Sequence, residues 1–160
     1  MNNKPGRHFA PLICWDIFME GMHRRMQFAD DIKSFQKIAK KYNWPLQDVA
    51  FDNTLIWENK VIVVTDNLLN ILHASVNILE MTGYAPGEVV GNNPKMFQGI
   101  ATEPDERSRI RQAVENHRPF KTIITNHKKD GSTYKCHIEA YPVFNIDGKL
   151  VNFVALENAA

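Results

Sequence analysis

Cysteine is scarce in this chain, whose 160 residues include only Cys14 and Cys136. Two cysteines so far apart in sequence indicate neither a disulfide framework nor a zinc site, and we expect both to be free thiols. An excess of charge of one sign is also lacking, because the formal net charge is +1. No overall basic field is therefore expected to recruit nucleic acid or an anionic membrane.

Long apolar runs are missing as well. No stretch approaches the roughly 20 apolar residues that a membrane span needs, and residues 11–15 are too short and wrongly flanked for a signal peptide. We therefore expect a cytoplasmic protein. The sequence also contains no nucleophile elbow, no phosphate-binding glycine loop and no pair of catalytic carboxylates, so we do not expect an enzyme.

The segment before Trp44 has the periodicity of an amphipathic helix, with apolar residues three or four positions apart. These residues form two sets, namely Trp15, Met19, Met22 and Met26, and then Phe28, Ile32, Phe35 and Ala39. Pro45 disfavours helical geometry in the residue before it, so the helix should end near Asn43. We expect residues 1–58 to form an N-terminal helical extension, with one more short helical turn within 46–58.

This extension is also the expected site of self-association. Helices of this kind are marginal in water without packing partners, and the apolar sets extend beyond what one small sheet can cover. We therefore expect a homodimer through the N-terminal helices. The competing outcome is that the helix folds back over the outer face of the domain's own sheet.

Beyond residue 58 the period shortens to that of strands. The β-branched run at 61–65, ended by Asp66, predicts a strand and a turn, and residues 71–74 predict its partner. Residues 75–83 predict short helical turns closed by a glycine. Thr102 has the form of an N-cap with an acidic residue three positions on, and it predicts a helix to about residue 117.

The last third of the chain predicts an antiparallel meander. Residues 120–127, 132–144 and 149–157 are strand candidates, and Asp-Gly turns join them at 129–131 and 146–148. Strands, then small helices, then three more strands are typical of an α+β domain with helices over one face of an antiparallel sheet.

Motifs in this part of the chain resemble the PAS family, and within it the flavin-binding LOV branch. Residues 91–99 read Gly-Asn-Asn-Pro-Lys-Met-Phe-Gln-Gly and resemble the LOV segment G-x-N-C-R-F-L-Q-G, with Pro94 where LOV proteins have their photoreactive cysteine. Residues 126–131, Asn-His-Lys-Lys-Asp-Gly, resemble the LOV hairpin "NYRKDG". The resemblance covers about residues 59–157. It implies a PAS fold, with a five-stranded antiparallel sheet and short helices on one face, followed by a tail at 158–160.

The resemblance also implies a cofactor site between the sheet and the small helices. Carried over residue by residue, the candidate cofactor-binding residues are Asn93, Lys95, Gln98, Arg111, Asn126, Cys136 and Glu157. In this comparison Lys95 and Arg111 take the two positions that face a phosphate, although lysine lacks the bidentate fork of arginine. Cys136 replaces a second asparagine. Glu157 replaces a glutamine, and a carboxylate cannot donate a hydrogen bond unless it is protonated.

Each of these residues also has a structural interpretation. Asn93 before Pro94 can simply start a turn. Gln98, Asn126 and Arg111 can line a small cavity or the surface without holding any ligand. The histidines lie in different expected elements without a carboxylate or cysteine at metal-ligand spacing, apart from the adjacent Cys136 and His137, which should point to opposite faces of a strand. We therefore expect no metal site.

The sequence therefore predicts a PAS-type sensory module that binds a small ligand or a signalling protein partner and signals through association. The missing cysteine at position 94 argues against a covalent LOV photoreceptor. The cofactor stays unknown: a flavin held without a covalent bond is the alternative, and it is not favoured. Haem is disfavoured because the helix expected at 102–117 looks polar. A ligand-free dimerisation domain is the remaining alternative.

Overall fold

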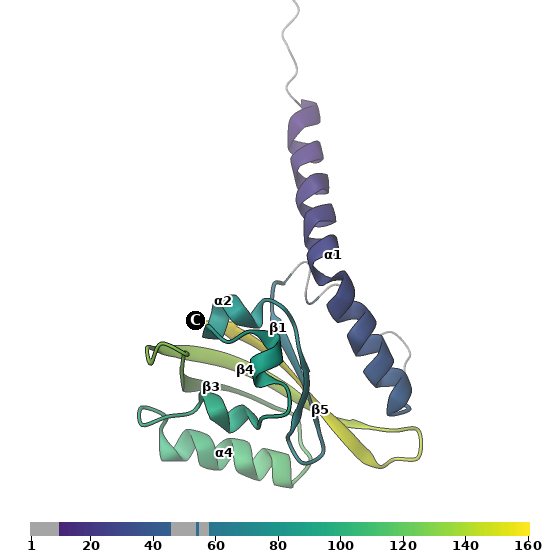
Figure 1. Ribbon diagram of the computed structural model, residues 1–160. Coiled ribbons are helices and arrows are strands. Elements are labelled where there is room, and N and C mark those ends of the chain that lie inside the picture. The colour runs from purple at the N-terminus through teal and green to yellow at the C-terminus, as the bar shows by residue number, and fades with distance from the viewer. Residues whose placement is uncertain (1–9, 46–53, 55–57) are drawn as a thin grey trace, which may run out of the picture.

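A five-stranded antiparallel sheet forms the centre of the computed structural model, which describes residues 10–45, 54 and 58–160, and only the backbone of residues 10–15 (Figure 1). The strands are β1 (Val61–Asp66), β2 (Ile71–Ala74), β3 (Phe120–His127), β4 (Thr133–Phe144) and β5 (Leu150–Ala159). Their order across the sheet is β2-β1-β5-β4-β3. The expected α+β class and the expected antiparallel sheet are confirmed.

The register of the strands divides the sheet into two faces. Val61 on β1 lies opposite Glu157 on β5, and Ile124 on β3 lies opposite Cys136 on β4. Because side chains alternate along a strand, these residues all point to one face. We call it the inner face; the small helices cover it (Figure 1).

The covering helices are α2 (Ile78–Thr82), α3 (Pro86–Val89), the 3-10 helix η2 (Pro94–Phe97) and α4 (Pro104–Glu115). Gly83 ends α2 with φ of 78° and donates its N–H to Leu79, as expected of a glycine C-cap. The expectation for Thr102 is wrong, because Glu103 is the N-cap residue of α4. Thr102 instead accepts from the N–H of Gly99 at 3.0 Å and donates to the carbonyl of Thr125 at 2.6 Å. Its hydroxyl thus ties the loop before α4 to β3.

Helix α1 (Ala10–Lys41) packs on the opposite, outer face of the sheet. Phe28, Phe35 and Ala39 are buried against Ile62 and Val64 of β1. This second apolar set therefore folds back onto the chain's own sheet, which is the competing outcome of the sequence analysis. The helix ends at Lys41, close to the expected position.

The N-terminal half of α1 extends well past the sheet (Figure 1). Met19, Met22 and Met26 of the first apolar set are 41%, 42% and 73% exposed. The side chain of Trp15 lies outside the described residues, as does most of the helical turn expected within 46–58. In the part of the chain that the structure describes, we find no helix long and apolar enough to cross a membrane.

A buried polar link joins the end of α1 to the sheet. Trp44 Nε1 donates to Asn152 Oδ1 at 2.8 Å, and the Asn152 amide donates in turn to the carbonyl of Thr65 at 2.9 Å. At the other end of the chain β5 continues to Ala159, which pairs with Cys136. Most of the expected tail at 158–160 is therefore strand.

Candidate functional site

An apolar cavity of about 100 Å³, the inner cavity, lies between the inner face of the sheet and the small helices. Its apolar walls come from the strands, from η2 and from α4, through side chains that include Val63, Phe97, Ile110, Ile124, Ile138 and Phe153. Three polar side chains that the sequence analysis singled out also line it: Gln98, Asn126 and Glu157. The cavity is thus a largely dry space with a few convergent polar groups, as small-molecule sites usually are.

A larger outer groove of about 510 Å³ adjoins the inner cavity. The two spaces share the lining residues Leu69, Pro94, Gln98, Ile110 and Val114. Lys95, Arg107 and Arg111 add three basic side chains to the groove, and Glu115 adds one acidic side chain, so the groove is basic on balance. Apolar inside and basic outside, the combined site suits a molecule with a flat apolar part and an anionic end.

The inner cavity contains a buried hydrogen-bond acceptor without a partner. Asn126 is 4% exposed, and its Oδ1 has no hydrogen-bond partner among the described residues. The hydroxyl of the neighbouring Tyr134 is likewise buried and makes no well-formed hydrogen bond in the described part of the chain, although Asn126 lies close enough to act on its pKa. Buried polar atoms in native proteins are nearly always paired. A ligand in the cavity that donates a hydrogen bond would therefore satisfy Asn126 Oδ1.

Cys136 is fully buried and does not line the cavity. Its Sγ donates to Glu157 Oε2 at 3.6 Å, so the thiol is a hydrogen-bond donor to the carboxyl group of Glu157. Burial raises the pKa of the Cys136 thiol well above its ordinary value, and the nearby Glu157 raises it further. The thiol therefore stays protonated at neutral pH.

Glu157 is an acid in an environment that disfavours its charge. It is 6% exposed, and burial raises its pKa to about 7, although the hydrogen bond from Cys136 acts in the opposite direction. A large part of Glu157 is therefore neutral at neutral pH. In that state its O–H can donate, which a carboxylate cannot do.

Asn93 and Pro94 begin the 3-10 helix η2. Asn93 Oδ1 accepts from the N–H of Lys95 at 3.0 Å, so the structural interpretation of this side chain applies, while it also lines the outer groove. Pro94 occupies the first helical position, where its fixed φ is favourable. Pro94 lines both spaces, and none of the described residues that line them carries a thiol.

Sequence reasoning missed Arg107 and Tyr134. Arg107 donates from Nη2 to the carbonyl of Gly99, while its Nε has no partner among the described residues. It precedes Arg111 by four residues on α4, and that spacing, which places both on one helix face, is the signal that could have found it. Tyr134 shares the inner face with Cys136 two residues on, which the alternation of β4 could have indicated. Among the described residues no cluster of His, Cys, Asp and Glu could hold a metal ion.

Comparison with known proteins places this architecture in a family. A family model described as "PAS domain" matches residues 59–158. Protein TWIN LOV 1 of Arabidopsis thaliana is 38% identical over 98 residues, which cover 59% of this chain and 25% of that protein. A blue-light-activated histidine kinase of Rhizobium johnstonii is 33% identical over 135 residues, covering 82% of this chain and 38% of the kinase. The chain thus spans well under half the length of these curated relatives.

Solved structures show the same likeness. A light-oxygen-voltage domain studied with a flavin analogue superposes with a TM-score of 0.65 at 27% identity, covering 71% of this chain and 86% of that one. The LOV domain of a blue-light-activated histidine kinase from Erythrobacter litoralis gives a TM-score of 0.59 at 25% identity, with 62% and 94% covered. With its family match, its sheet and its helix-covered cavity in agreement, the chain belongs to the PAS domain family and resembles the LOV branch.

Proposed function

We propose that this PAS domain is the sensory part of a signalling protein and that its inner cavity and outer groove bind a flavin nucleotide without a covalent bond. The observation that carries the proposal is the unpaired Oδ1 of Asn126, buried in an apolar cavity that opens into a groove lined by Lys95 and Arg111. The domain boundaries proposed with it are 1–58 for the helical extension and 59–157 for the PAS domain, whose last strand takes in most of the tail expected at 158–160.

The residues present fit a flavin in chemical terms. Asn126 Oδ1 would accept a hydrogen bond from an N–H at the ring edge, while Gln98 and neutral Glu157 would donate to acceptors on it. Lys95 and Arg111 would meet the phosphate through charge-assisted hydrogen bonds. When bound, a flavin supplies visible-light absorption and redox chemistry. The names of the relatives, which include blue-light-activated histidine kinases and LOV domains, support this ligand class.

Affinity for the flavin ring should be lower than in a site with an asparagine at position 136, because Cys136 donates its S–H to Glu157 and not to a group in the cavity. We therefore expect the protein to lose flavin during purification, to be colourless as purified, and to take up FMN when it is added. A covalent bond between the protein and the flavin is not part of the proposal. Pro94 has no thiol, and Cys136 lies outside the cavity lining.

Titration of the purified protein with FMN, followed by quenching of flavin fluorescence, tests the proposal. We expect saturable one-to-one binding that weakens about tenfold, or about 1.4 kcal/mol, in Asn126→Ala. Asn158→Ala is the matched control, since it removes an exposed asparagine of β5 outside both lining sets. Absence of binding at high FMN concentration would leave the ligand-free dimerisation domain as the better interpretation.

The signal is proposed to leave the domain through association of α1 with a second copy. Met19, Met22 and Met26 are exposed on the part of α1 that extends past the sheet (Figure 1), and they continue the helix whose later residues are buried on it. An apolar stripe of this kind is stabilised when it packs against another helix. A ligand that favours one arrangement of α1 on the sheet would shift the association equilibrium.

A further inference from the structure

Glu157 lies between two separate spaces. It lines the inner cavity, and it also lines a second pocket of about 330 Å³, which we call the side pocket. The side pocket is formed by residues from the start of β1, from α2 and from the end of β5, namely Glu58, Asn59, Val61, Asn77, Glu80, Met81, Asn158 and Ala159. Several of them, Glu58 and Glu80 included, are exposed, so the side pocket borders solvent next to the buried Glu157.

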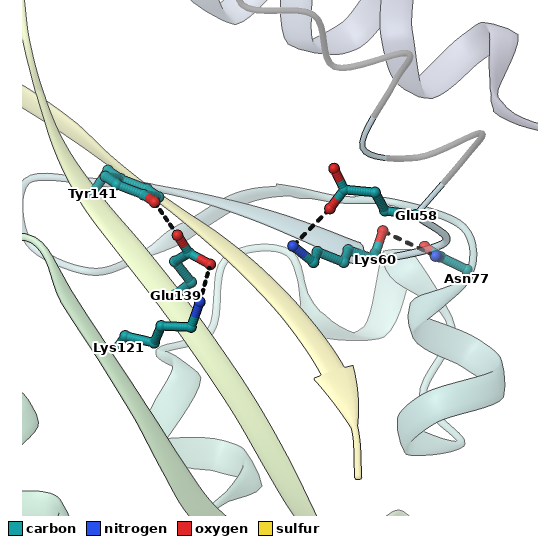
Figure 2. A network of polar contacts seen from close by, with 6 residues as sticks. All are labelled: Glu58, Lys60, Asn77, Lys121, Glu139 and Tyr141. Carbon is teal, nitrogen blue, oxygen red and sulfur yellow. Dashed lines mark hydrogen bonds and ion pairs between the residues drawn. The ribbon is translucent and has the colours of Figure 1, made fainter.

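Among the described residues, no cation lines the side pocket. Lys60 Nζ pairs with Glu58 Oε2 at 2.7 Å, and the Lys60 carbonyl accepts from the Asn77 amide at 3.1 Å (Figure 2). The side chain of Lys60 is thus engaged at the surface. Among the described residues the one hydrogen-bond partner of the Glu157 carboxyl group is the Cys136 thiol, which is neutral.

The titratable groups around Glu157 can be named element by element. Strand β4 contributes Tyr134 and Cys136, whose pKa values burial raises. The segment just before β1 contributes Glu58, which is paired with Lys60, and α2 contributes Glu80. β3 contributes only the neutral amide of Asn126. The surroundings are therefore neutral or acidic and favour the protonated carboxyl group, in agreement with its pKa of about 7.

We propose that Glu157 is a proton-linked specificity residue: as a neutral acid it donates a hydrogen bond to an acceptor atom of the ligand in the inner cavity, and it exchanges its proton with water through the side pocket. The inference rests on the proposed function, since the ligand class it specifies is a flat heteroaromatic ring with an acceptor at its edge. Ligand uptake and proton uptake are then coupled. The carboxylate form of Glu157 has no hydrogen to donate, and its negative charge repels the partial negative charge of the ligand's acceptor atom.

The expected size of the coupling follows from the protonated fraction. Apparent affinity scales with the fraction of protein in the binding-competent state, and that fraction falls about tenfold for each pH unit above the midpoint. Affinity for a flavin ring should therefore be nearly constant below about pH 6 and roughly 100-fold weaker at about pH 9.

Riboflavin is the appropriate probe, because it lacks the phosphate whose own ionisation would add to the pH dependence. Its affinity is measured by fluorescence quenching between about pH 6 and pH 9 for wild type, Glu157→Gln and Glu80→Gln. Glutamine donates at every pH, so Glu157→Gln should bind with a flat profile. Glu80→Gln removes an exposed carboxyl group of the side pocket and should keep the wild-type profile.

A flat wild-type profile, superimposable on that of Glu157→Gln, would overturn the inference while leaving flavin binding intact. If neither riboflavin nor FMN binds at any pH, the proposed function fails. The ¹³C shift of the Glu157 carboxyl carbon in the ligand-free protein then decides whether Glu157 is a proton site. A midpoint near pH 7 would show that Glu157 is a proton site, whose ligand would then be another molecule with an acceptor atom. A midpoint near the ordinary value of 4.5 would overturn the inference. The same spectrum keeps the test valid if Glu157→Gln does not fold.

Discussion

The carboxylate of Asp31 on α1 lies 2.9 Å from Nε2 of His73 on β2. Its second oxygen accepts from the backbone N–H of Val76 at 2.8 Å. The ring of His73 also meets Phe35 of the same helix edge-on, with centroids 4.8 Å apart and an interplanar angle of 87°. One helix face thus contacts the edge strand through both a polar and an aromatic interaction. This is a specific attachment between α1 and the sheet that forms the cavity.

Asp31→Ala removes the acceptor of both His73 and the Val76 N–H. We expect the free energy of unfolding to fall by about 2 kcal/mol, since two partly buried donors are left without their acceptor. Hydrogen exchange should increase in α1 before it increases in the central strands. The control is Asp30→Ala, whose exposed pair with Lys33 at 3.5 Å should contribute under about 0.5 kcal/mol. Equal stability of the two variants would contradict a docking role for Asp31.

Glu157 should make folding depend on pH. Its pKa rises from the ordinary 4.5 to about 7 in the folded protein, so the folded state binds more protons than the unfolded state between these values. The stabilisation from the neutral acid is full below the lower value and is lost as pH rises through the upper one. Urea unfolding should show Glu157→Gln gaining about 2–3 kcal/mol relative to wild type between about pH 5 and pH 8. A difference independent of pH would refute this.

The basic groove should recognise phosphate and not the ring. Replacing both Lys95 and Arg111 by alanine should weaken FMN binding about 100-fold, or about 2.7 kcal/mol for two charge-assisted hydrogen bonds, with riboflavin affinity nearly unchanged. Arg109→Ala, a charge removed from the same helix outside the groove lining, is the matched control. Equal losses for FMN and riboflavin would mean that the two cations act on the fold and not on the ligand.

Pro94→Cys should place a thiol where the inner cavity and the outer groove meet. The first position of η2 does not require proline, because its N–H has no helical partner in any case. With FMN bound, we expect the flavin absorption of this variant to bleach reversibly in blue light, while wild type and Pro94→Ala do not bleach. A variant that binds FMN and stays unbleached would show that this position does not face the ring.

Met22→Ser combined with Met26→Ser should convert the proposed dimer to a monomer, because both side chains are exposed on the projecting part of α1. Light scattering over a wide concentration range measures the mass, with Gln27→Ser as the control on the same turn. A wild type that remains monomeric throughout would refute the dimer. An unchanged dimer in the double variant would move the interface to the outer face of β3 and β4, where Ile123 and Tyr141 are 47% and 41% exposed.

That outer face already carries its own polar cluster, which makes it the less apolar of the two surfaces. Glu139 accepts from Lys121 at 3.1 Å and from the Tyr141 hydroxyl (Figure 2). The hydrogen bond from Tyr141, followed by that from Lys121, lowers the pKa of Glu139. Such a solvated cluster contributes little to association, and for this reason the methionine stripe of α1 is the proposed interface.

The sequence by itself determined the order of the strands and small helices along the chain, and this order together with the motifs indicated the family. Alternation, glycine C-caps and Asp-Gly turns are local signals, so residues 120–127 could be read as a strand and Gly83 as a helix end without knowledge of the rest. The same holds for the polar candidates Gln98 and Asn126, which motif position alone assigned to one site and which the structure places around one cavity.

Only the tertiary structure decided which of these groups interact. Cys136 meets Glu157 because β4 pairs with β5 in a register that sets Ile138 opposite Glu157, and no local pattern specifies the pairing of strands by residue. Thr102 bonds β3 instead of capping α4, and Asp31 finds His73 across 42 residues of chain. Burial in a shared core determines the partner, the protonation state and the exposure of each group. These properties arise from contacts between segments distant in sequence, where propensity and periodicity carry no information.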